Sequence, residues 1–343
     1  APAAAAPPRR PGKRRSSPLA RRLAKSSGLD LSGITGSGPG GSVVKRDVDA
    51  ALATRKVFES RPAARAAPQP GQPISAPAAS APFVFLSGQG PLALTEMRKG
   101  VGAPLVLIHG FGGDMSAWRA FLNHLPPERA VLALDLPAHG GSRDVSANGF
   151  DAVVEAVCDT LLGAGVHSAH LCGHSLGGAV AASIATAGLM DARSLTLLAP
   201  AGLGTAINAD FLRGFCAATD EHALAPWMGL LAHDPRVVGG ALIRATAAAR
   251  ADPTLVSAQS ALASALFPGG AQRFSIVEAL ERFAGPVRMI YGRDDAILRP
   301  DDMEARAPAH VAVHRLRAVG HLPQLEAPAL VGRIIAETIR SAG

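Results

Sequence analysis

Short apolar runs alternate with longer amphipathic segments along the last two-thirds of the chain. The runs are PLVLIHG, AVLALDL, AHLCGH, SLTLLAP, PVRMIYG and VAVHRLR, at residues 104–110, 130–136, 169–174, 194–200, 286–292 and 311–317. Helical spacing occurs at residues 150–163, 177–188 and 327–341. Apolar runs separated by helices are typical of parallel strands that are buried on both faces. The pattern therefore predicts an α/β fold, with a mostly parallel sheet and helices on both faces.

One stretch interrupts this alternation. Residues 203–275 are rich in alanine and contain no clear strand. Ligand sites of α/β proteins are concave and lie beside the sheet, where an inserted helical segment can cover them. We therefore expect a helical cap at about residues 203–275, within a domain that spans residues 83–343.

The N-terminal part of the chain has two segments without any such pattern. Residues 1–16 and 54–82 are dominated by alanine and proline, with several arginines. Segments of this composition cannot bury enough apolar surface to fold and usually connect folded parts. We interpret both as linkers on either side of a small domain at residues 17–53.

The small domain is predicted to contain two helices. Ser17 and Pro18 suit the N-cap and the first position of a helix, and Gly28 suits its end. A glycine-rich loop at 33–42 then precedes a second helical pattern at 43–53. This size is near the lower limit for a fold without a disulfide or a metal.

The motif GxSxG occurs at residues 173–177, directly after one predicted strand and before a predicted helix. In that setting the glycines allow a tight turn that projects the serine hydroxyl, and the helix start provides backbone donors for an anion. Ser175 is therefore the candidate nucleophile. A glycine-rich packing turn is the alternative explanation of the motif.

A second glycine-rich loop, HGFGG, begins at the end of the predicted strand 104–110. A loop in this position provides one backbone N–H of an oxyanion hole, and the residue after the nucleophile provides the other. We expect these donors to be the N–H groups of Phe111 and Leu176. A glycine turn without a ligand is the alternative.

An acid and a base follow the last two predicted strands. Asp294 and Asp295 come after the strand at 286–292, and His321 comes after the strand at 311–317. A serine nucleophile needs a histidine that takes its proton and a carboxylate that orients the histidine. We favour His321 as the base and Asp295 as the acid, with Asp294 as the alternative acid.

These motifs resemble those of the α/β-hydrolase family, in which the triad follows the chain order Ser, Asp, His. The matching stretches are HGFGG, DLPAHGGS, GHSLGG, GRDD and GH, at 109–113, 135–142, 173–178, 292–295 and 320–321. The resemblance implies an α/β-hydrolase fold with a helical cap for residues 83–343. It also implies that Ser175, Asp295 and His321 are the triad, and that Phe111 and Leu176 form the oxyanion hole.

A second resemblance concerns residues 17–48, SPLARRLAKSSGLDLSGITGSGPGGSVVKRDV. This segment resembles the peripheral-subunit-binding domain of acyltransferases in 2-oxo acid dehydrogenase complexes. In that family, basic side chains bind acidic faces of the decarboxylase or of dihydrolipoyl dehydrogenase. The resemblance implies these partners for residues 17–53, with binding side chains Arg21, Arg22, Lys45 and Arg46. Asp47 is expected to accept hydrogen bonds from loop N–H groups instead.

The two resemblances together imply a function. A docking domain followed by an α/β-hydrolase domain resembles the acyltransferase component of acetoin dehydrogenase complexes, which moves an acetyl group from dihydrolipoyl lysine to coenzyme A (CoA). The lipoyl group is then expected on a domain upstream of Ala1 and CoA is expected as the acceptor, so this chain binds no cofactor of its own. The alternatives are a carboxylesterase or thioesterase that uses water, and a non-catalytic assembly subunit.

The charge distribution favours a protein partner over nucleic acid. Lys and Arg total 34 against 27 Asp and Glu, a net charge of +7. Residues 1–56 hold 12 basic and 3 acidic residues, a balance of +9, whereas residues 57–343 hold 22 and 24, a balance of −2. The excess surrounds the docking segment, and no aromatic residue in 17–53 could stack on bases. We therefore expect no binding of nucleic acid.

Hydropathy and cysteine content bound the remaining possibilities. The chain has no uninterrupted apolar run of about 18 residues, so no membrane-spanning helix is expected. Its three cysteines, Cys158, Cys172 and Cys216, are an odd number without metal-ligand spacing. Neither a disulfide framework nor a metal site is expected, and a reducing cytoplasm is the expected location.

Overall fold

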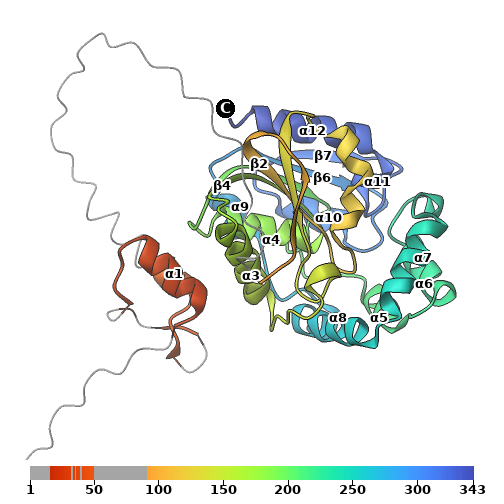
Figure 1. The fold of residues 1–343 in the computed structure, drawn as a ribbon, viewed down its shortest axis with the longest axis horizontal. Helices are drawn as coiled ribbons and strands as arrows, with labels where there is room; N and C mark the ends of the chain where they lie inside the picture. The colour runs from red at the N-terminus through yellow and green to blue at the C-terminus, as the bar shows by residue number, and fades with distance from the viewer. Residues whose placement is uncertain (1–15, 32–33, 35, 39–40, 50–90) are drawn as a thin grey trace, which may run out of the picture. The chain divides into compact units, whose positions relative to one another are not determined.

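The computed structural model describes residues 16–31, 34, 36–38, 41–49 and 91–343 of the chain (Figure 1). The chain divides into two units, Ala1–Ala78 and Ala79–Gly343, and each is described here by itself. Both predicted linkers lie outside the described residues, apart from Ser16.

A seven-stranded sheet forms the centre of the larger unit, with the strand order β1-β3-β2-β4-β5-β6-β7. The strands are β1 (Leu94–Arg98), β2 (Val101–Ile108), β3 (Arg129–Leu134), β4 (Ser168–His174), β5 (Asp191–Leu198), β6 (Val287–Gly292) and β7 (Ala312–Leu316). Neighbouring strands are parallel except for β1 and β3, which are antiparallel. The six predicted strands correspond to β2 to β7, which confirms the α/β fold with a mostly parallel sheet.

Strand β1 is the one strand of the sheet that the sequence does not predict. It lies at the edge of the sheet, and its residues LTEMR are only partly buried or exposed. An antiparallel edge strand tolerates charged side chains such as Glu96 and Arg98. It therefore lacks the continuous apolar run by which buried parallel strands are found.

Helices cover both faces of the sheet (Figure 1). One face is covered by α3 (Phe150–Gly163) and α4 (Leu176–Ala185), and the other by α12 (Pro328–Arg340) with the short η3 (Met115–Trp118) and η4 (Ala120–His124). Strand β2 feeds both cores, because Val106 and Ile108 pack on the first side and Leu105 and Leu107 on the second. Helices α3, α4 and α12 confirm the three helices predicted for this domain.

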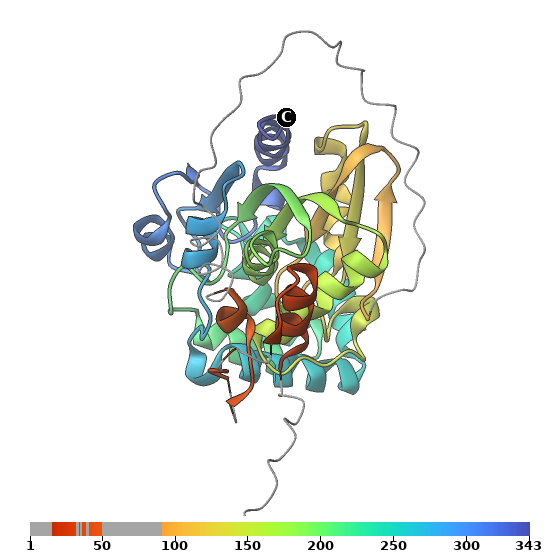
Figure 2. The ribbon, with the colours of Figure 1, turned by 90° about the vertical axis from the view of Figure 1, so that its left-hand side faces the viewer.

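The helical cap is present between β5 and β6. Its helices are α5 (Ala209–Ala217), α6 (Glu221–Gly229), α7 (Gly239–Arg250) and α8 (Pro253–Leu266), with the turns η6 (Pro235–Val237) and η7 (Pro268–Gly270). Figures 1 and 2 show these helices gathered at one end of the larger unit. After the cap, α9 (Val277–Arg282) returns to the body and packs on α4.

The two ends of the cap meet at one narrow junction. Ala206 and Ala271 form an antiparallel bridge there. The Gln272 side chain accepts a hydrogen bond from the Gly202 N–H at 2.7 Å and donates to the Gly204 carbonyl at 2.9 Å. This pairing holds the cap on the sheet where it leaves and re-enters the body.

The motifs singled out in the sequence all lie at one edge of the sheet. Those of the larger unit follow β2, β3, β4, β6 and β7, which end at Ile108, Leu134, His174, Gly292 and Leu316. Because the carboxyl ends of parallel strands meet at the same edge, these loops come together. The short helices η5 (Gly140–Ser142), α10 (Pro300–Arg306) and α11 (Pro323–Glu326) lie in such loops.

The smaller unit contains α1 (Pro18–Ser26), which begins and ends as the sequence predicts. The Ser17 side chain accepts a hydrogen bond from the Ala20 N–H at 3.1 Å, and Gly28 has a φ of +60° just past the helix. Residues 45–49 form the described part of the second predicted helix, and 50–53 lie outside the described residues.

Asp47 joins the glycine-rich loop to this second helix. Its Oδ2 accepts hydrogen bonds from the N–H groups of Ser37 and Val44, both at 2.9 Å. These bonds hold the pKa of Asp47 below its usual value, and the hydroxyl of Ser37 is the largest contributor. The expectation that Asp47 accepts loop N–H groups is confirmed. The core beneath consists of Ala20, Leu23, Ala24, Val43 and Val48.

Candidate active site

Ser175 lies at the turn between β4 and α4, as its motif predicts. Its φ of 53° and ψ of −117° are costly for a residue with a side chain. The Ser175 N–H donates to the Leu198 carbonyl at 2.9 Å. Its carbonyl accepts from the N–H groups of Gly178, Ala179 and Ala201. The surrounding structure therefore imposes the strain, and the hydroxyl projects at the start of α4.

The two glycines of the motif are required by close backbone packing. A Cβ on Gly173 would lie 2.1 Å from the Gly177 carbonyl oxygen. A Cβ on Gly177 would lie 2.3 Å from the Ile108 carbonyl oxygen. Helix α4 can approach β4 and β2 this closely only because neither position carries a side chain.

The structure brings His321 and Asp295 together. His321 Nδ1 lies 2.7 Å from Asp295 Oδ2, and both residues are buried. The alternative carboxylate, Asp294, has its Oδ2 3.0 Å from His233 Nδ1 at an exposed position. Of the two adjacent aspartates, Asp295 is therefore the one placed to orient His321.

Asp295 is held by the backbone as well as by the histidine. Its Oδ1 accepts hydrogen bonds from the N–H groups of Ile297 at 2.8 Å and Leu298 at 2.9 Å. Oδ2 then accepts the Nδ1–H of His321. A carboxylate fixed in this way favours the tautomer that leaves His321 Nε2 free to accept a proton.

His174 supports the loop of His321 from below. Its Nε2 lies 2.7 Å from the His321 carbonyl oxygen, and burial lowers the pKa of His174 to about 3. The ring is therefore neutral near pH 7 and donates its Nε2–H to that carbonyl. The His321 N–H donates to the Leu231 carbonyl at 2.8 Å. The backbone of His321 is thus held at both its N–H and its carbonyl.

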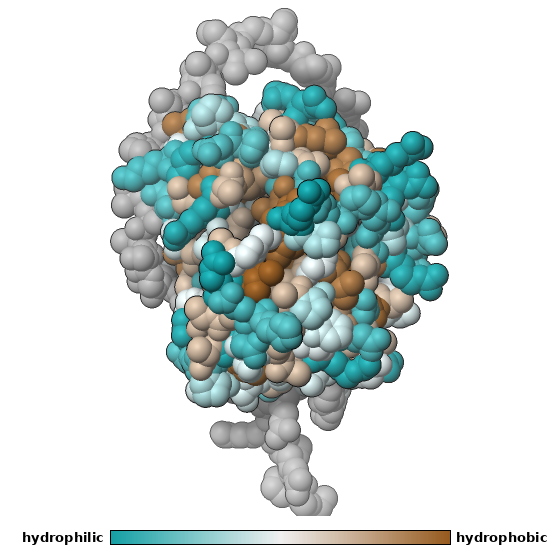
Figure 3. Space-filling model, turned by 90° about the vertical axis from the view of Figure 1, so that its right-hand side faces the viewer, coloured by the Kyte–Doolittle hydropathy of each residue, from teal (hydrophilic) through white to brown (hydrophobic). Residues whose placement is uncertain are grey.

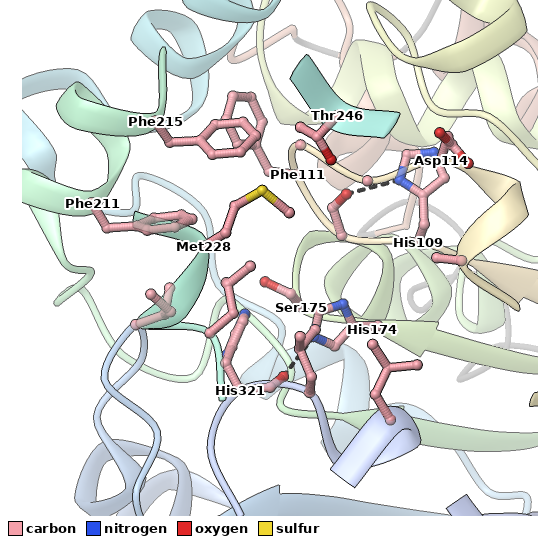
Figure 4. Close-up of a pocket in the computed structure, with 18 of the residues that line it drawn as sticks. His109, Phe111, Asp114, His174, Ser175, Phe211, Phe215, Met228, Thr246 and His321 are labelled. Carbon is pink, nitrogen blue, oxygen red and sulfur yellow. Dashed lines mark hydrogen bonds between the residues drawn. The ribbon is translucent and has the colours of Figure 1, made fainter. Parts of the chain in front are cut away.

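Ser175 and His321 line one cavity of about 130 Å³ (Figure 4). Figure 4 shows the Ser175 hydroxyl directed into this space, beside His321. No hydrogen bond joins the Ser175 hydroxyl to the His321 ring among the described residues. Such bonds are often long in free enzymes and tighten when substrate binds. The cavity is therefore the place where a substrate would meet both groups.

The N–H groups of Phe111 and Leu176 donate to no other group in the described part of the chain. The carbonyl of Gly110 accepts hydrogen bonds from His109 Nδ1 at 2.8 Å and from the Gly113 N–H at 3.1 Å. Because the C=O and N–H of one trans peptide point in opposite directions, these bonds turn the Phe111 N–H away from them. Leu176 begins α4, where N–H groups have no partner within the helix. Both groups are available to an oxyanion.

Two buried histidines, His109 and His139, accept backbone hydrogen bonds in and beside the loop at residues 109–113. The sequence does not predict this role. His109 Nε2 accepts from the Leu136 N–H at 3.0 Å, and His139 Nε2 accepts from the Gly112 N–H at 2.8 Å. Burial lowers the pKa of both rings, that of His139 to about 3. Both rings are therefore neutral near pH 7 and able to accept a backbone N–H. In the sequence, their shared signal is a glycine directly after each histidine.

Apolar side chains of the cap form much of the cavity wall. Figure 4 shows Phe211, Phe215 and Met228 near Phe111 and facing the open space. The cap also contributes Ile207, Leu212, Leu231, Leu242 and Phe267. No lysine or arginine lines this cavity within the described part of the chain. Figure 3 shows apolar side chains at the centre of the face that carries α6, α7 and α11, surrounded by hydrophilic ones. The wall that the cap provides is therefore mostly apolar, while Asp114, Thr246 and Gln324 add polar groups to the lining of the cavity.

A buried arginine holds Phe215 in place. Arg250 is 2% exposed and donates to the carbonyls of Ala218 and Cys216, both at 2.8 Å. Its guanidinium carbon lies 4.7 Å from the centre of the Phe215 ring, an attractive cation–π geometry. The edge of the same ring reaches Gly112, where a Cβ would lie only 2.6 Å from Phe215 Cε1. Phe215 is thus held between Arg250 and the loop at residues 109–113.

Arg21 and Arg22, two of the predicted docking residues, lie on α1. Arg21 is exposed and donates to the Ser16 carbonyl at 2.9 Å. Arg22 is half-buried. Arg21 therefore offers the more accessible charge of the two.

Lys45 and Arg46, the other two predicted docking residues, make contacts within the smaller unit. Lys45 Nζ lies 2.9 Å from Asp49 Oδ2. Arg46 is exposed and donates to the Ser37 carbonyl at 2.9 Å. Arg46 therefore has a structural role in the glycine-rich loop as well as an exposed charge.

The described residues offer few other functional groups. None of their helices combines the length and the apolar character needed to cross a membrane. They contain no cluster of three or more His, Cys, Asp or Glu side chains placed to hold a metal ion. None of the three cysteines, Cys158, Cys172 and Cys216, is in a disulfide. Burial raises the pKa of Cys172 and Cys216, which makes them poor nucleophiles.

Comparison with known proteins separates the chain into two matches. Residues 105–334 match the family model of the alpha/beta hydrolase family. Residues 14–49 match the model of the E3 binding domain. These segments contain the two sets of motifs that the sequence analysis compares with known families.

Two relatives are each described as the dihydrolipoyllysine-residue acetyltransferase component of an acetoin cleaving system. The relative from Pseudomonas putida is 38% identical over 229 residues, which are 66% of this chain and 60% of that protein. The relative from Cupriavidus necator is 32% identical over 250 residues, 72% of this chain and 66% of that protein. The chain thus spans less than two-thirds of the length of these relatives.

Solved structures share the fold of the larger unit. A meta-cleavage product hydrolase from Pseudomonas fluorescens IP01 gives a TM-score of 0.65 at 20% identity, over 77% of this chain and 99% of that one. A 2-hydroxy-6-oxo-6-phenylhexa-2,4-dienoate hydrolase from Rhodococcus gives 0.63 at 21%, over 73% and 99%. Likenesses at this identity establish the fold alone. The family match over residues 105–334 shows that the chain belongs to the alpha/beta hydrolase family, and the match over residues 14–49 shows that it carries an E3 binding domain in its N-terminal part.

Proposed function

We propose that the chain is the acyltransferase subunit of an acetoin or 2-oxo acid dehydrogenase-type complex. It moves an acetyl group from dihydrolipoyl lysine to CoA by way of Ser175. The observation that carries this proposal is the presence, in one chain, of a match to the E3 binding domain and a cavity that joins Ser175 to the His321–Asp295 pair. The names of the two relatives support the type of complex.

The first half-reaction acylates the enzyme. The Ser175 hydroxyl attacks the thioester carbonyl of acetyl-dihydrolipoyl lysine while His321 Nε2 takes the hydroxyl proton. The N–H groups of Phe111 and Leu176 hold the oxyanion of the tetrahedral intermediate. The C–S bond then breaks, and His321 returns the proton to the departing thiolate. Acetyl-Ser175 and the free dithiol result.

The second half-reaction reverses these roles. The CoA thiol gives its proton to His321 and attacks the acetyl-Ser175 ester, again through an intermediate held by the oxyanion hole. His321 then returns the proton to Ser175, which releases acetyl-CoA. The lipoyl group and CoA enter as substrates and are not held as resident cofactors. The apolar cap wall formed by Phe211, Phe215 and Met228 limits access of water to the ester.

Transfer of acetyl from S-acetyl-dihydrolipoamide to CoA tests the proposal directly. Ser175→Ala should lower the rate of acetyl-CoA formation at least about 10⁴-fold, since the nucleophile is lost. Ser194→Ala is a matched control. The Ser194 hydroxyl oxygen lies 2.8 Å from Nδ1 of His170, but neither residue lines the cavity. That variant should stay within about threefold of wild type.

The same assay distinguishes the other two functions. Acetate as the main product in the presence of saturating CoA would identify a thioesterase or esterase with water as acceptor. A Ser175→Ala variant as active as wild type would contradict the catalytic assignment. A wild-type chain inert toward both the thioester and p-nitrophenyl acetate would favour a non-catalytic assembly subunit.

We further propose that residues 17–53 bind dihydrolipoyl dehydrogenase, with the decarboxylase as the alternative partner. The match to the E3 binding domain and the basic residues Arg21, Arg22, Lys45 and Arg46 support this partner. Attraction between this surface and an acidic one should weaken as salt is added. Three cysteines without a disulfide fit a reducing location, and we propose the cytoplasm.

Charge reversal at one exposed arginine tests the docking surface. Arg21→Glu in the full chain should raise the Kd for dihydrolipoyl dehydrogenase about tenfold or more at low salt, and less at high salt. Arg46 is less suitable because its bonds hold Ser37 of the glycine-rich loop, whereas those of Arg21 reach only Ser16, just before α1. Arg213→Glu, which reverses an exposed charge in the cap, is the control and should leave the Kd unchanged. Equal effects of the two reversals would contradict the proposed surface.

A further inference from the structure

A second carboxylate holds the loop of His321 by its backbone. Glu326, the last residue of α11, accepts the Gly320 N–H on both of its oxygens, at 2.9 and 3.0 Å. It also accepts the Leu322 N–H at 3.3 Å. Gly320 and Leu322 are the two neighbours of His321 in the chain. Glu326 therefore binds the backbone of the histidine loop on both sides of His321 along the chain.

The same carboxylate reaches the base of the cap. Glu326 Oε2 accepts a hydrogen bond from the His233 N–H at 2.7 Å. The His321 N–H donates to the Leu231 carbonyl at 2.8 Å, so the two segments are joined at a second point. A Cβ on Gly320 would lie 2.8 Å from the His233 nitrogen, which shows how closely they pack. The cap segment 231–233 and the histidine loop thus form one bonded unit.

The chemistry of this clamp requires a carboxylate. Three backbone N–H groups converge on Glu326, and no lysine, arginine or histidine side chain in the described residues forms an ion pair with it. An ionised carboxylate offers two acceptor oxygens and no donor, whereas glutamine has one acceptor and an NH₂ that would face a backbone N–H. Hydrogen bonds to a charged acceptor are also stronger than neutral ones.

We propose that Glu326 is a positioning residue, which fixes the His321 loop against the cap segment 231–233 and thereby keeps the ring in reach of Ser175. The inference rests on the proposed role of His321 as the general base. Asp295 orients the ring from its side chain, and Glu326 places the backbone that carries the ring. A misplacement of about 1 Å at a catalytic group can lower a rate about 100-fold.

The test uses the full chain with p-nitrophenyl acetate, and active sites are counted with an organophosphonate that labels Ser175. Glu326→Gln should lower kcat per labelled site between about 10-fold and 100-fold, while KM changes less than about threefold. Glu337→Gln is the matched control, because Glu337 is a partly exposed carboxylate that pairs with Arg288 at 3.0 Å outside the cavity. Its kcat should stay within about twofold of wild type.

The His321→Ala background distinguishes positioning from general support of the fold. If Glu326 acts through His321, Glu326→Gln should change the residual rate of His321→Ala less than about twofold. An equal loss in both backgrounds, or a wild-type kcat per labelled site in Glu326→Gln, would overturn the inference. Should Glu326→Gln not fold, Glu326→Asp keeps the charge, shortens the reach and serves the same comparison. If His321→Ala itself keeps wild-type activity, the proposed function fails, whatever the effect at Glu326.

Discussion

Replacing Asp295 by asparagine should lower kcat about 10⁴-fold, whereas the same change at Asp294 should leave it within about threefold of wild type. Asp295 Oδ2 accepts the Nδ1–H of His321 at 2.7 Å, and its Oδ1 is held by two backbone N–H groups. An asparagine side chain can present its NH₂ to the ring, which favours the tautomer with a proton on Nε2. That tautomer cannot take the proton of Ser175.

The neighbouring Asp294 provides an unusually close control for this prediction. Its carboxylate lies at an exposed position, 3.0 Å from His233 Nδ1, whereas the carboxylate bonded to His321 is that of Asp295. Both variants remove one negative charge from the same turn, so a general electrostatic effect would appear in both. The rates are measured with p-nitrophenyl acetate and with acetyl transfer to CoA, after thermal unfolding shows that both proteins are folded. Equal losses in the two variants would contradict the assignment of the acid.

The sequence is sufficient to predict the architecture wherever burial on both sides leaves a continuous apolar run. Strands β2 to β6 are found in this way, because a parallel strand under helices has no polar face. Strand β7, at the other edge of the sheet, is only half-buried or exposed and is predicted without such a run. The edge strand β1 is not predicted from the sequence, since Glu96 and Arg98 are tolerated where one side of the strand faces solvent. The cap can be predicted as a helical insertion from its alanine-rich composition. Its junction at Gln272 depends on contacts that no local pattern encodes.

The candidate site likewise contains residues that local motifs predict and residues whose roles depend on tertiary contacts. Ser175 and His321 can be predicted because each follows a strand end within a recognisable local motif. The sequence favours Asp295 but leaves Asp294 as an alternative, because adjacent residues point to opposite sides and the turn decides which carboxylate faces His321. The contact of Glu326 with His233 joins residues that are far apart in the chain, so it has no sequence signal at all.

The largest effect on stability is expected at Gly173, two residues before Ser175. Gly173→Ala should destabilise the larger unit by about 3–5 kcal/mol, because its Cβ would lie 2.1 Å from the Gly177 carbonyl oxygen and 2.6 Å from the Gly178 nitrogen. These obstacles are backbone atoms of α4, so no side chain can move aside. Helix α4 would have to shift away from β4, and Ser175 would lose the bonds that hold its strained turn.

Gly229→Ala tests whether this cost arises from packing or from the loss of a glycine as such. Gly229 ends α6, and a Cβ there would meet only Pro235 Cβ, at an ordinary contact distance of 3.7 Å. Alanine is favoured over glycine in a helix by about 0.5–1 kcal/mol, so this variant should unfold at the wild-type temperature or slightly above it. Thermal unfolding and the yield of labelled Ser175 are measured for both. If Gly173→Ala kept the wild-type Tm and full labelling, β4 and α4 would not be packed by their backbones, and the account of how the fold strains Ser175 would be wrong.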